Sequence, residues 1–251
     1  MNRMILSLAV AIGVMGTAHA AAAGEISAEQ RRAFEAIIRD YLITHPEVIK
    51  EAIQELERRQ AVEAQAGTKK KIGERAKEIY QASGDLVLGN PKGKVTVVEF
   101  FDYNCGYCKK AVPEVEKLIQ SDSDVRVVVK EFPILGPGSL FAAKAALASR
   151  SQGKYDEFHL ALIKLDGVKD ETSVMQVAQQ IGLDLEKLKT DMESDGVAEV
   201  ISRNYSLAES LAISGTPSFI IDEALEPGFV TYDVLAAHVS TVRQNGGCRV
   251  C

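Results

Sequence analysis

Two of the four cysteines stand two residues apart, in the run Cys105-Gly106-Tyr107-Cys108. The reactive form of cysteine is the thiolate, and a free thiol, with a pKa of about 8.5, is mostly protonated at neutral pH. We expect a helix to begin just after Cys105, which would place its sulfur near unpaired amide groups at the positive end of the helix dipole. That position favours the thiolate and predicts Cys105 as a nucleophile. Cys108, one turn further on, could then attack the mixed disulfide and release the bound partner.

A pair with this spacing could also be half of a metal site, or two buried apolar thiols. A zinc-ribbon site needs a second pair about 15 to 20 residues away, whereas the second pair here, Cys248 and Cys251, lies at the far C-terminus. We therefore expect Cys105 and Cys108 to form a redox-active disulfide, with no metal and no other cofactor.

The second pair stands in the terminal run Gly246-Gly247-Cys248-Arg249-Val250-Cys251. It could form a local disulfide, act as a second redox pair that relays electrons, or supply two ligands to a metal at the surface. Flexible tails rarely hold catalytic geometry. A small disulfide or accessory thiol pair is therefore favoured, and these two cysteines are left out of the predicted catalytic residues.

The first residues predict the compartment. Arg3 gives a positive start, an apolar stretch runs from Met4 to Gly16, and Ala18-His19-Ala20 has the small residues of a cleavage site. This pattern is typical of a secretory signal peptide over residues 1–20. A retained membrane anchor is disfavoured, because crossing the hydrocarbon takes about 20 apolar residues. We expect a mature chain that begins near Ala21 and is periplasmic, where disulfides persist.

The overall charge excludes one class of partner. The net charge is −6, from 29 Lys and Arg against 35 Asp and Glu, so we expect no nucleic acid, whose phosphates need a concentrated basic surface. The only basic cluster, Lys69-Lys70-Lys71, is short. It is interpreted as part of a solvated linker over residues 66–71.

Three segments rich in β-branched and aromatic residues predict strands, at residues 94–101, 125–132 and 218–222. The first two are almost continuously apolar, which predicts a sheet covered on both faces. The long segment between the second and third predicted strands, residues 139–211, is rich in Ala, Leu, Gln, Glu and Lys. This composition predicts a helical insertion.

A last amphipathic helix is expected from about Tyr232 to Arg243, before the glycines that end it. Strands separated by helices indicate an α/β layered domain, which we place at residues 85–245, with a cysteine-containing tail at 246–251.

Residues 21–72 predict a helical arm. Ser27 with Gln30, and Thr44 with Glu47, fit the capping box that opens a helix. Each of the two helices has a single apolar stripe, formed by Phe34, Ile37, Ile38, Tyr41 and Leu42 in the first and by Val48, Ile49, Ala52, Ile53 and Leu56 in the second. Such stripes must be buried, either by copies of the same segment in other subunits or by the chain's own catalytic domain. Oligomerisation through residues 27–65 is favoured, and docking on the catalytic domain stays open.

Three features together resemble a known family: the run from Val98 to Cys108, the later Gly215-Thr216-Pro217-Ser218-Phe219, and the long helical insertion between them. They are similar to the thioredoxin-fold DsbA-like oxidoreductases, and in particular to the trimeric ScsC-type proteins. The resemblance covers roughly Leu86 to Arg243, together with the N-terminal helices. It implies a thioredoxin fold with a helical insertion (DsbA-like), preceded by an N-terminal helical oligomerisation arm.

The resemblance also implies roles around the cysteines. In the family, the proline at the position of Pro217 follows a cis peptide bond beside backbone that pairs with substrate, and the residue at Thr216 tunes redox potential and substrate release. Gly106 and Tyr107 would share this substrate-binding surface. Glu99 matches an acid beneath the disulfide that relays a proton to the resolving thiol. A carboxyl in an apolar strand should have a raised pKa, although an acid at a strand edge facing water is the alternative.

Tyr107 replaces the histidine found in strong oxidases of the family, and losing that cation argues for a weaker oxidant. We therefore expect a homotrimeric protein disulfide isomerase that acts on unfolded or misoxidised exported proteins and receives electrons from a membrane thiol reductase. Net oxidation or reduction by the same fold, copper(I) binding through thiolates, and a holdase that uses the arm are the alternatives. His159, which lies among apolar residues of the insertion, is expected to be structural.

Overall fold

The computed structural model describes residues 26–251, so the predicted signal peptide and the expected start near Ala21 lie outside the described residues. The chain divides into two compact units, Met1–Arg59 and Gln60–Cys251. Between residues 26 and 251, no helix combines the length and the apolar character needed to cross a membrane.

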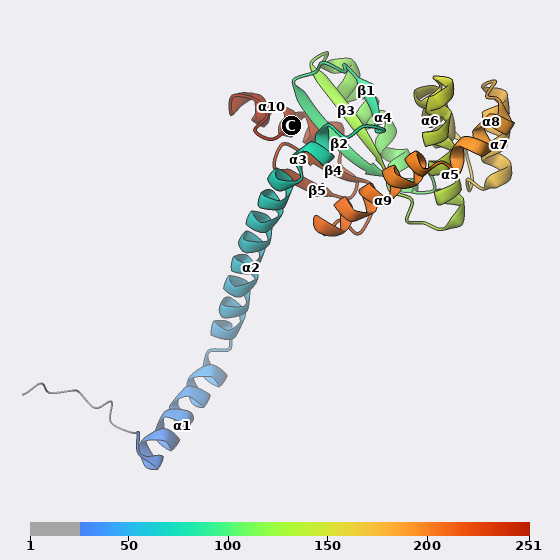
Figure 1. Ribbon diagram of the computed structural model, residues 1–251. Helices are drawn as coiled ribbons and strands as arrows, with labels where there is room; N and C mark the ends of the chain where they lie inside the picture. Colours follow the sequence, from blue (N-terminus) through green and yellow to red (C-terminus); the bar gives the residue numbers. More distant parts are fainter. Residues whose placement is uncertain (1–25) are drawn as a thin grey trace, which may run out of the picture. The chain divides into compact units, whose positions relative to one another are not determined.

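Two helices contribute to the described part of the first unit (Figure 1): α1 (Ala28–Thr44) and the beginning of α2 (Glu47–Glu74). The predicted capping box of α1 is confirmed, since Gln30 N donates to Ser27 Oγ at 3.2 Å and Ser27 N donates to Gln30 Oε1 at 3.0 Å. The second predicted box is wrong, because Thr44 is the last residue of α1. Pro46, whose fixed φ suits the start of a helix, directly precedes α2 instead.

The predicted linker over residues 66–71 is also wrong, because α2 continues through it to Glu74. Lysine is a good helix former, and one glycine inside a helix costs only about 1 kcal/mol relative to alanine. Ile72, near the end of α2, is fully buried in the core of the second unit and stabilises these last turns. The local loss of apolar pattern around Gly67 gives no indication of that distant contact.

A five-stranded mixed sheet forms the centre of the second unit, in the order β1-β3-β2-β4-β5. The strands are β1 (Leu86–Gly89), β2 (Val95–Phe101), β3 (Val125–Glu131), β4 (Ser218–Ile221) and β5 (Ala224–Pro227). The central strands β2 and β3 are parallel, and every other neighbouring pair is antiparallel. The three predicted strands are confirmed as β2, β3 and β4. The short edge strands β1 and β5 have no predicted counterpart.

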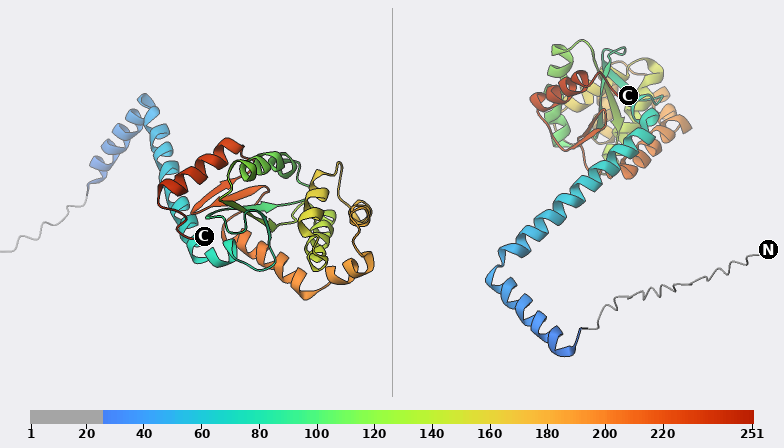
Figure 2. Two further views of the ribbon diagram at one scale, coloured as in Figure 1. Left: turned by 90° about the horizontal axis from the view of Figure 1, so that it is seen from above. Right: turned by 90° about the vertical axis from the view of Figure 1, so that its left-hand side faces the viewer.

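Helices cover both faces of the sheet (Figure 2). On one face lie α4 (Gly106–Ser121) and α10 (Tyr232–Gln244), and on the other lie α3 (Ala76–Tyr80) and the end of α9 (Asp195–Ser210). The predicted insertion between β3 and β4 is confirmed as helical. Its elements before α9 are α5 (Pro137–Ser149), a 3-10 turn (Arg150–Gln152), α6 (Tyr155–Lys164), α7 (Glu171–Gln180) and α8 (Leu185–Met192).

Side chains of the central strands alternate between two cores. Val98 and Phe100 pack on the side of α3, whereas Val97 packs on the side of α4, and all of β2 is buried. The predicted sheet with two covered faces is therefore confirmed. A third core, inside the helical insertion, includes both Cys105 and Cys108. The cysteine pair thus lies where the sheet meets the insertion.

Candidate active site

The helix after the first cysteine begins where the sequence predicts. Cys105 is the N-cap of α4, and the backbone N–H of Cys108 donates to Cys105 Sγ at 3.4 Å. An N-cap side chain pairs with amides that the first turn of a helix leaves without partners. Both cysteines are free thiols, with exposed fractions of 7% for Cys105 and 0% for Cys108. The predicted nucleophile, Cys105, is therefore at the edge of the surface, and the sulfur of Cys108 lies beneath it.

The pKa of Cys105 is lowered from 9.0 to about 5. The largest cause is the hydrogen bond from the Cys108 thiol, and Thr216 and the amides of Cys108 and Tyr107 act in the same direction, against the effect of burial. Cys105 is accordingly a thiolate at neutral pH. This stabilisation needs no histidine, because the donors are backbone amides and the second thiol.

Cys108 has the opposite tendency. Its pKa is raised, first by burial and then by the hydrogen bond to Cys105 and the charge of Glu99. Glu99 is 6% exposed and lies on β2, in register between Val129 of β3 and Phe219 of β4. Burial raises the pKa of Glu99 to about 8, with a further contribution from the charge on Cys105. Glu99 is thus a buried acid on the central strand, not one at a strand edge facing water.

The loop before β4 lies against the nucleophile. The Thr216–Pro217 peptide bond is cis. In the thiol form, Cys105 Sγ donates to the carbonyl oxygen of Thr216 at 3.1 Å. The structure therefore brings the predicted residues of the loop next to the predicted nucleophile, although they are more than a hundred positions apart in sequence.

Gly106 and Tyr107 form the surface beside the nucleophile. Tyr107 is 59% exposed, and Lys110 Nζ lies 4.8 Å from the centre of its ring, within the range of a cation–π contact. A Cβ at Gly106 would have no atom within 4 Å. Both positions therefore face open space from which another chain could approach Cys105.

Sequence reasoning missed Asp102, which holds the turn before the nucleophile. Its Oδ1 accepts from Asn104 N at 2.7 Å, and its Oδ2 accepts from the N–H groups of Ile134 and Leu135 at 2.8 and 2.9 Å. The first bond is a local turn contact that an aspartate commonly makes. The other two bind the end of β2 to the loop between β3 and α5, and no local signal indicates them.

Asn104, also missed, ties the same turn to the helical insertion. Its Oδ1 accepts from Lys169 N at 2.7 Å, while its Nδ2 donates to Lys169 O at 3.0 Å and to Ser139 Oγ at 3.2 Å. The two chain segments that carry Ser139 and Lys169 approach closely at Gly138, where a Cβ would collide with the Lys169 carbonyl oxygen. The position of Cys105 thus depends on contacts made deep in the insertion.

A buried polar network lies behind the turn. Glu131 Oε1 accepts from the hydroxyls of Tyr103 at 2.9 Å and Tyr155 at 3.0 Å, and Tyr103 also pairs with His159 Nδ1 at 2.9 Å. Burial raises the pKa of Glu131 to about 8 and lowers that of His159 to about 4. His159 is therefore neutral at neutral pH and packs in the insertion, in agreement with its expected structural role. Glu131, at the end of an apolar strand, has no predicted counterpart.

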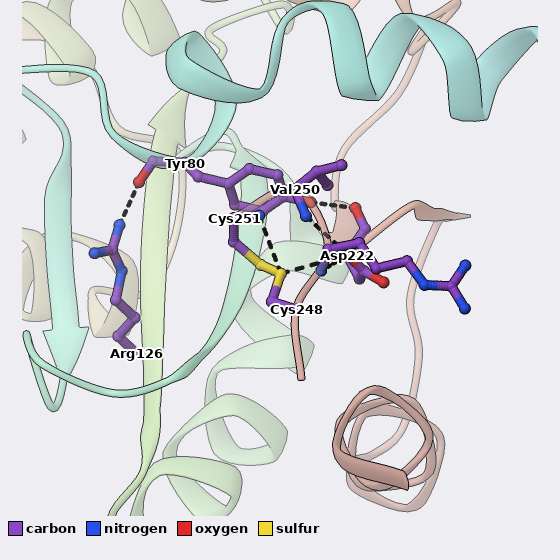
Figure 3. The surroundings of a disulfide bond; sticks show 7 residues. Tyr80, Arg126, Asp222, Cys248, Val250 and Cys251 are labelled. Carbon is purple, nitrogen blue, oxygen red and sulfur yellow. Dashed lines mark hydrogen bonds between the residues drawn. A yellow bond between two sulfur atoms is a disulfide. The ribbon is translucent and has the colours of Figure 1, made fainter. Parts of the chain in front are cut away.

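The second cysteine pair forms the small disulfide that the sequence favours, Cys248–Cys251. Figure 3 shows it beside Asp222, which follows β4. Within residues 26–251, Asp222 with these two cysteines is the one group of three or more His, Cys, Asp or Glu residues whose donor atoms could hold a metal ion. That group does not include Cys105 or Cys108.

Comparison with known proteins adds two family matches. Residues 96–240, more than half of the chain, match the DSBA-like thioredoxin domain. Residues 30–63 match the N-terminal domain of the copper resistance protein ScsC.

Individual relatives agree with these matches. The crystal structure of a thioredoxin-like oxidoreductase from Silicibacter pomeroyi DSS-3 is 49% identical, with a TM-score of 0.66, over 67% of this chain and 97% of that chain. A linker-deletion mutant of ScsC from Proteus mirabilis is 26% identical, with a TM-score of 0.64, over 88% of this chain and 98% of that chain. An Na+/H+ antiporter NhaA of Salinispora arenicola is 30% identical over 159 residues, which are 62% of this chain and 24% of that protein. The chain spans about a quarter of the length of such antiporter relatives.

Proposed function

The chain belongs to the DSBA-like thioredoxin family, and on that premise we propose that it is a thiol–disulfide oxidoreductase acting on exported proteins. The match also confirms the predicted thioredoxin fold with a helical insertion. The observation that carries the proposal is the setting of Cys105, a helix N-cap sulfur whose pKa is lowered to about 5 and which contacts Thr216. A thiol that only packs in an apolar core has a raised pKa instead.

In the reductive direction, the Cys105 thiolate attacks one sulfur of a substrate disulfide, forms a mixed disulfide and releases the other substrate sulfur as a thiolate. Cys108 then gives up its proton and attacks Cys105 Sγ, which releases the second substrate sulfur. The substrate gains two electrons, and the cysteine pair loses two as it becomes a disulfide. In the oxidative direction every step runs in reverse.

The proton of Cys108 needs a partner inside the protein, because this sulfur has no exposed surface. Glu99 is a buried acid whose charge acts on Cys108. With a pKa raised to about 8, Glu99 is mostly protonated at neutral pH. It can therefore give a proton to Cys108 when that sulfur leaves the disulfide, and take the proton back when Cys108 attacks.

Isomerisation uses only the first half of this cycle. The released substrate thiolate attacks a different substrate disulfide, and a substrate sulfur finally displaces Cys105, with no net gain or loss of electrons. We propose this as the main activity, in the periplasm, because Tyr107 stands where a cation would favour strong oxidation. The activity requires reduced Cys105, so we propose a membrane thiol reductase as the electron donor and misoxidised exported proteins as substrates.

The arm supports assembly of several copies, which we propose to be a trimer. Several large apolar side chains of the stripes on α1 and α2 are more than half exposed within the chain, among them Ile37 at 64%, Tyr41 at 53% and Ile53 at 51%. Rows of exposed apolar side chains mark interaction surfaces. The match of residues 30–63 to the ScsC N-terminal domain covers the same segment. A trimer would place several catalytic sites around one substrate.

Mass measurement by light scattering tests the assembly. The unmodified chain should have the mass of three copies, and Ile37→Asp with Ile53→Asp should reduce it to that of one copy. Glu51→Gln, a polar change on α2, is the control and should leave the mass unchanged. A monomeric unmodified chain, or a doubly substituted chain that stays oligomeric, would overturn the assignment of this interface.

Reactivation of scrambled ribonuclease tests the activity. The unmodified protein should restore ribonuclease activity, Cys105→Ser should not, and Cys108→Ala should keep part of the effect because the first attack needs only Cys105. The matched control is Cys248→Ser with Cys251→Ser, which should remain active. A Cys105→Ser protein as active as the unmodified one would end the proposal.

A further inference from the structure

The tail disulfide encloses four residues after α10 and faces a carboxylate. Asp222 Oδ1 accepts from the backbone N–H groups of Arg249 at 2.8 Å and Val250 at 3.3 Å, and lies 3.4 Å from Cys248 Sγ. Figure 3 shows these contacts. The turn that carries Cys248 and Cys251 is therefore built around Asp222.

The same group is fixed to the body of the domain. The Tyr80 hydroxyl donates to the backbone oxygen of Asp222. Val250 and Cys251 pack against the core that contains Ile72 and Tyr80. The sulfurs of the tail are thus held in place by an apolar contact on one side and a carboxylate on the other.

The tail pair is remote from the active site. Pro217 and Asp222 flank the two ends of β4 (Ser218–Ile221), and the five residue steps between them, at about 3.3 Å each, separate them by roughly 16 Å. A disulfide bond is only about 2 Å long. Cys248 and Cys251 therefore do not exchange with Cys105 of the same domain while the tail holds this position.

The charge around the tail sulfurs is unbalanced. Asp222 is 9% exposed, and within residues 26–251 it has no ion-pair partner. Arg249, which lies between the two cysteines in sequence, is already paired with Glu223 at 3.2 Å. If the disulfide were reduced, two thiolates and this carboxylate would place three negative charges close together, and these charges would repel one another. A bound cation would remove that repulsion.

The donor atoms are placed for such a cation. The two sulfurs and a carboxylate oxygen of Asp222 lie within 4.8 Å of one another. Cys251 N donates to Cys248 Sγ at 3.1 Å, which helps to orient that sulfur. A hollow opens beside Asp222, and Lys69, His238 and Arg249 are among its other lining residues, whereas neither cysteine lines it. Two sulfurs and one oxygen, with a fourth position for water, suit a borderline divalent cation such as Zn2+.

We propose that the reduced tail is a metal site, in which Cys248, Cys251 and Asp222 bind one divalent cation of the zinc type. An external dithiol first reduces the tail: its two sulfurs become a disulfide, the Cys248–Cys251 bond breaks, and two protons pass to the tail sulfurs. The cation then displaces these two protons and binds the thiolates. An external disulfide reverses these steps: its S–S bond breaks and its two sulfurs become thiols, the Cys248–Cys251 bond forms again, and the cation is released. The site does not depend on the activity of Cys105.

Cobalt(II) is the probe, because its thiolate complexes have a charge-transfer absorption that reports sulfur ligation. The protein is the full chain with Cys105→Ser and Cys108→Ser, reduced with a dithiol and then freed of it. We expect one equivalent of cobalt bound with thiolate absorption, displacement by Zn2+, and no binding before reduction. Absence of cobalt binding to the reduced protein, or binding that persists with Cys248→Ser, would overturn the proposal.

The carboxylate is tested by Asp222→Asn, which keeps an oxygen for the backbone N–H groups but loses the charge. Loss of a direct ligand should weaken Zn2+ binding by about tenfold or more, since even supporting contacts around metal ligands are worth that much. Glu223→Gln, next in the chain, should leave the affinity unchanged. Equal Zn2+ affinity of the Asp222→Asn and unmodified tails would overturn the three-ligand site, as would copper(I) binding that exceeds Zn2+ binding and ignores Asp222.

Discussion

The chain carries the same cysteine spacing twice, and the two pairs differ in almost everything else. Cys105 begins a helix and receives hydrogen bonds from amides, so its pKa is lowered to about 5 and both sulfurs are free thiols. Cys248 follows the last helix, lies beside the carboxylate of Asp222, and is joined to Cys251 in a disulfide. The spacing allows a small ring in both places. In both places the backbone N–H of the second cysteine donates to the sulfur of the first, so the difference lies in the helix N-terminus at one pair and the carboxylate of Asp222 at the other.

The largest expected difference between the pairs is the reactivity of their thiols. In the fully reduced protein at pH 7, we expect iodoacetamide to modify Cys105 at least about tenfold faster than either tail cysteine, because Cys105 caps a helix and has a lowered pKa, whereas the tail sulfurs lie beside the carboxylate of Asp222. Mass spectrometry of timed samples gives the rates. Equal rates at Cys105 and Cys248 would break the comparison.

The same comparison has a pH dependence. The Cys105 thiolate forms as pH rises through about 5, well below the usual thiol value of 9.0. Because the folded pKa is lowered, the reduced protein gains stability from this group as pH rises from about 5 towards 9, and loses it again as pH falls through 5. The melting temperature of the reduced protein should therefore rise relative to that of the oxidised protein as pH increases across this range, and a constant difference between the two would contradict this prediction.

Glu99→Gln should change one step of disulfide exchange and leave the thiolate of Cys105 in place. Loss of an acid that transfers a proton typically costs about a hundredfold in rate, so Cys108 should leave the disulfide more slowly when a substrate thiolate attacks Cys105. In the unmodified protein the rate of this oxidative step should decline as pH rises through about 8, where Glu99 loses its proton. In Glu99→Gln this decline should be absent. Quenched alkylation follows the step, and Glu116→Gln on the exposed side of α4 is the control. An unchanged pH profile in Glu99→Gln would remove Glu99 from the mechanism.

Asn104→Ala should act on the position of Cys105. It removes three hydrogen bonds and leaves the Lys169 backbone unpaired, at a cost of about 2 to 4 kcal/mol. We expect a lower melting temperature and a slower alkylation of Cys105. Asn90→Ala, which removes hydrogen bonds at Ser123 and Lys92 instead, is the matched control. Asn90→Ala should lower the melting temperature without slowing the alkylation of Cys105. If both variants slow the alkylation equally, the effect of Asn104→Ala comes from a general loss of stability and not from the position of Cys105.

The smallest effect should follow Cys248→Ser with Cys251→Ser. Closing a loop of four residues is worth about 2 kcal/mol by the chain-entropy model, and a domain of this size loses about 2 to 4 °C per kcal/mol. Thermal unfolding should show this loss while disulfide exchange by Cys105 stays unchanged. A loss of exchange activity would mean that the two pairs are not independent.

Local signals in the sequence are sufficient for the parts of the fold with strong patterns. The continuous apolar runs of β2 and β3 and the cysteine motif before α4 predict the sheet centre and the nucleophile. β5 (Ala224–Pro227) has no such pattern and exists because β4 offers a partner. The linker prediction fails for the same reason: the burial of Ile72 in a distant core extends α2 through a polar, lysine-rich stretch.

The candidate site divides in the same way. Cys105, Cys108, Glu99 and the Thr216–Pro217 loop could be named from motifs and a family resemblance. The residues that hold the turn before Cys105 could not be predicted, because Asp102 binds residues about thirty positions away and Asn104 binds Lys169, 65 positions away. A single sequence carries no mark of such pairings.

Gly138 has a consequence for how the protein tolerates variation. The side chain of any larger residue there would collide with the Lys169 carbonyl oxygen and push away the segment that binds Asn104. A scan of all substitutions would therefore find Gly138 as intolerant as a catalytic cysteine, although it bears no reactive atom. A ranking of positions by intolerance alone would therefore not distinguish a catalytic cysteine, which is needed for its reactive sulfur, from Gly138, which is needed because no side chain fits there.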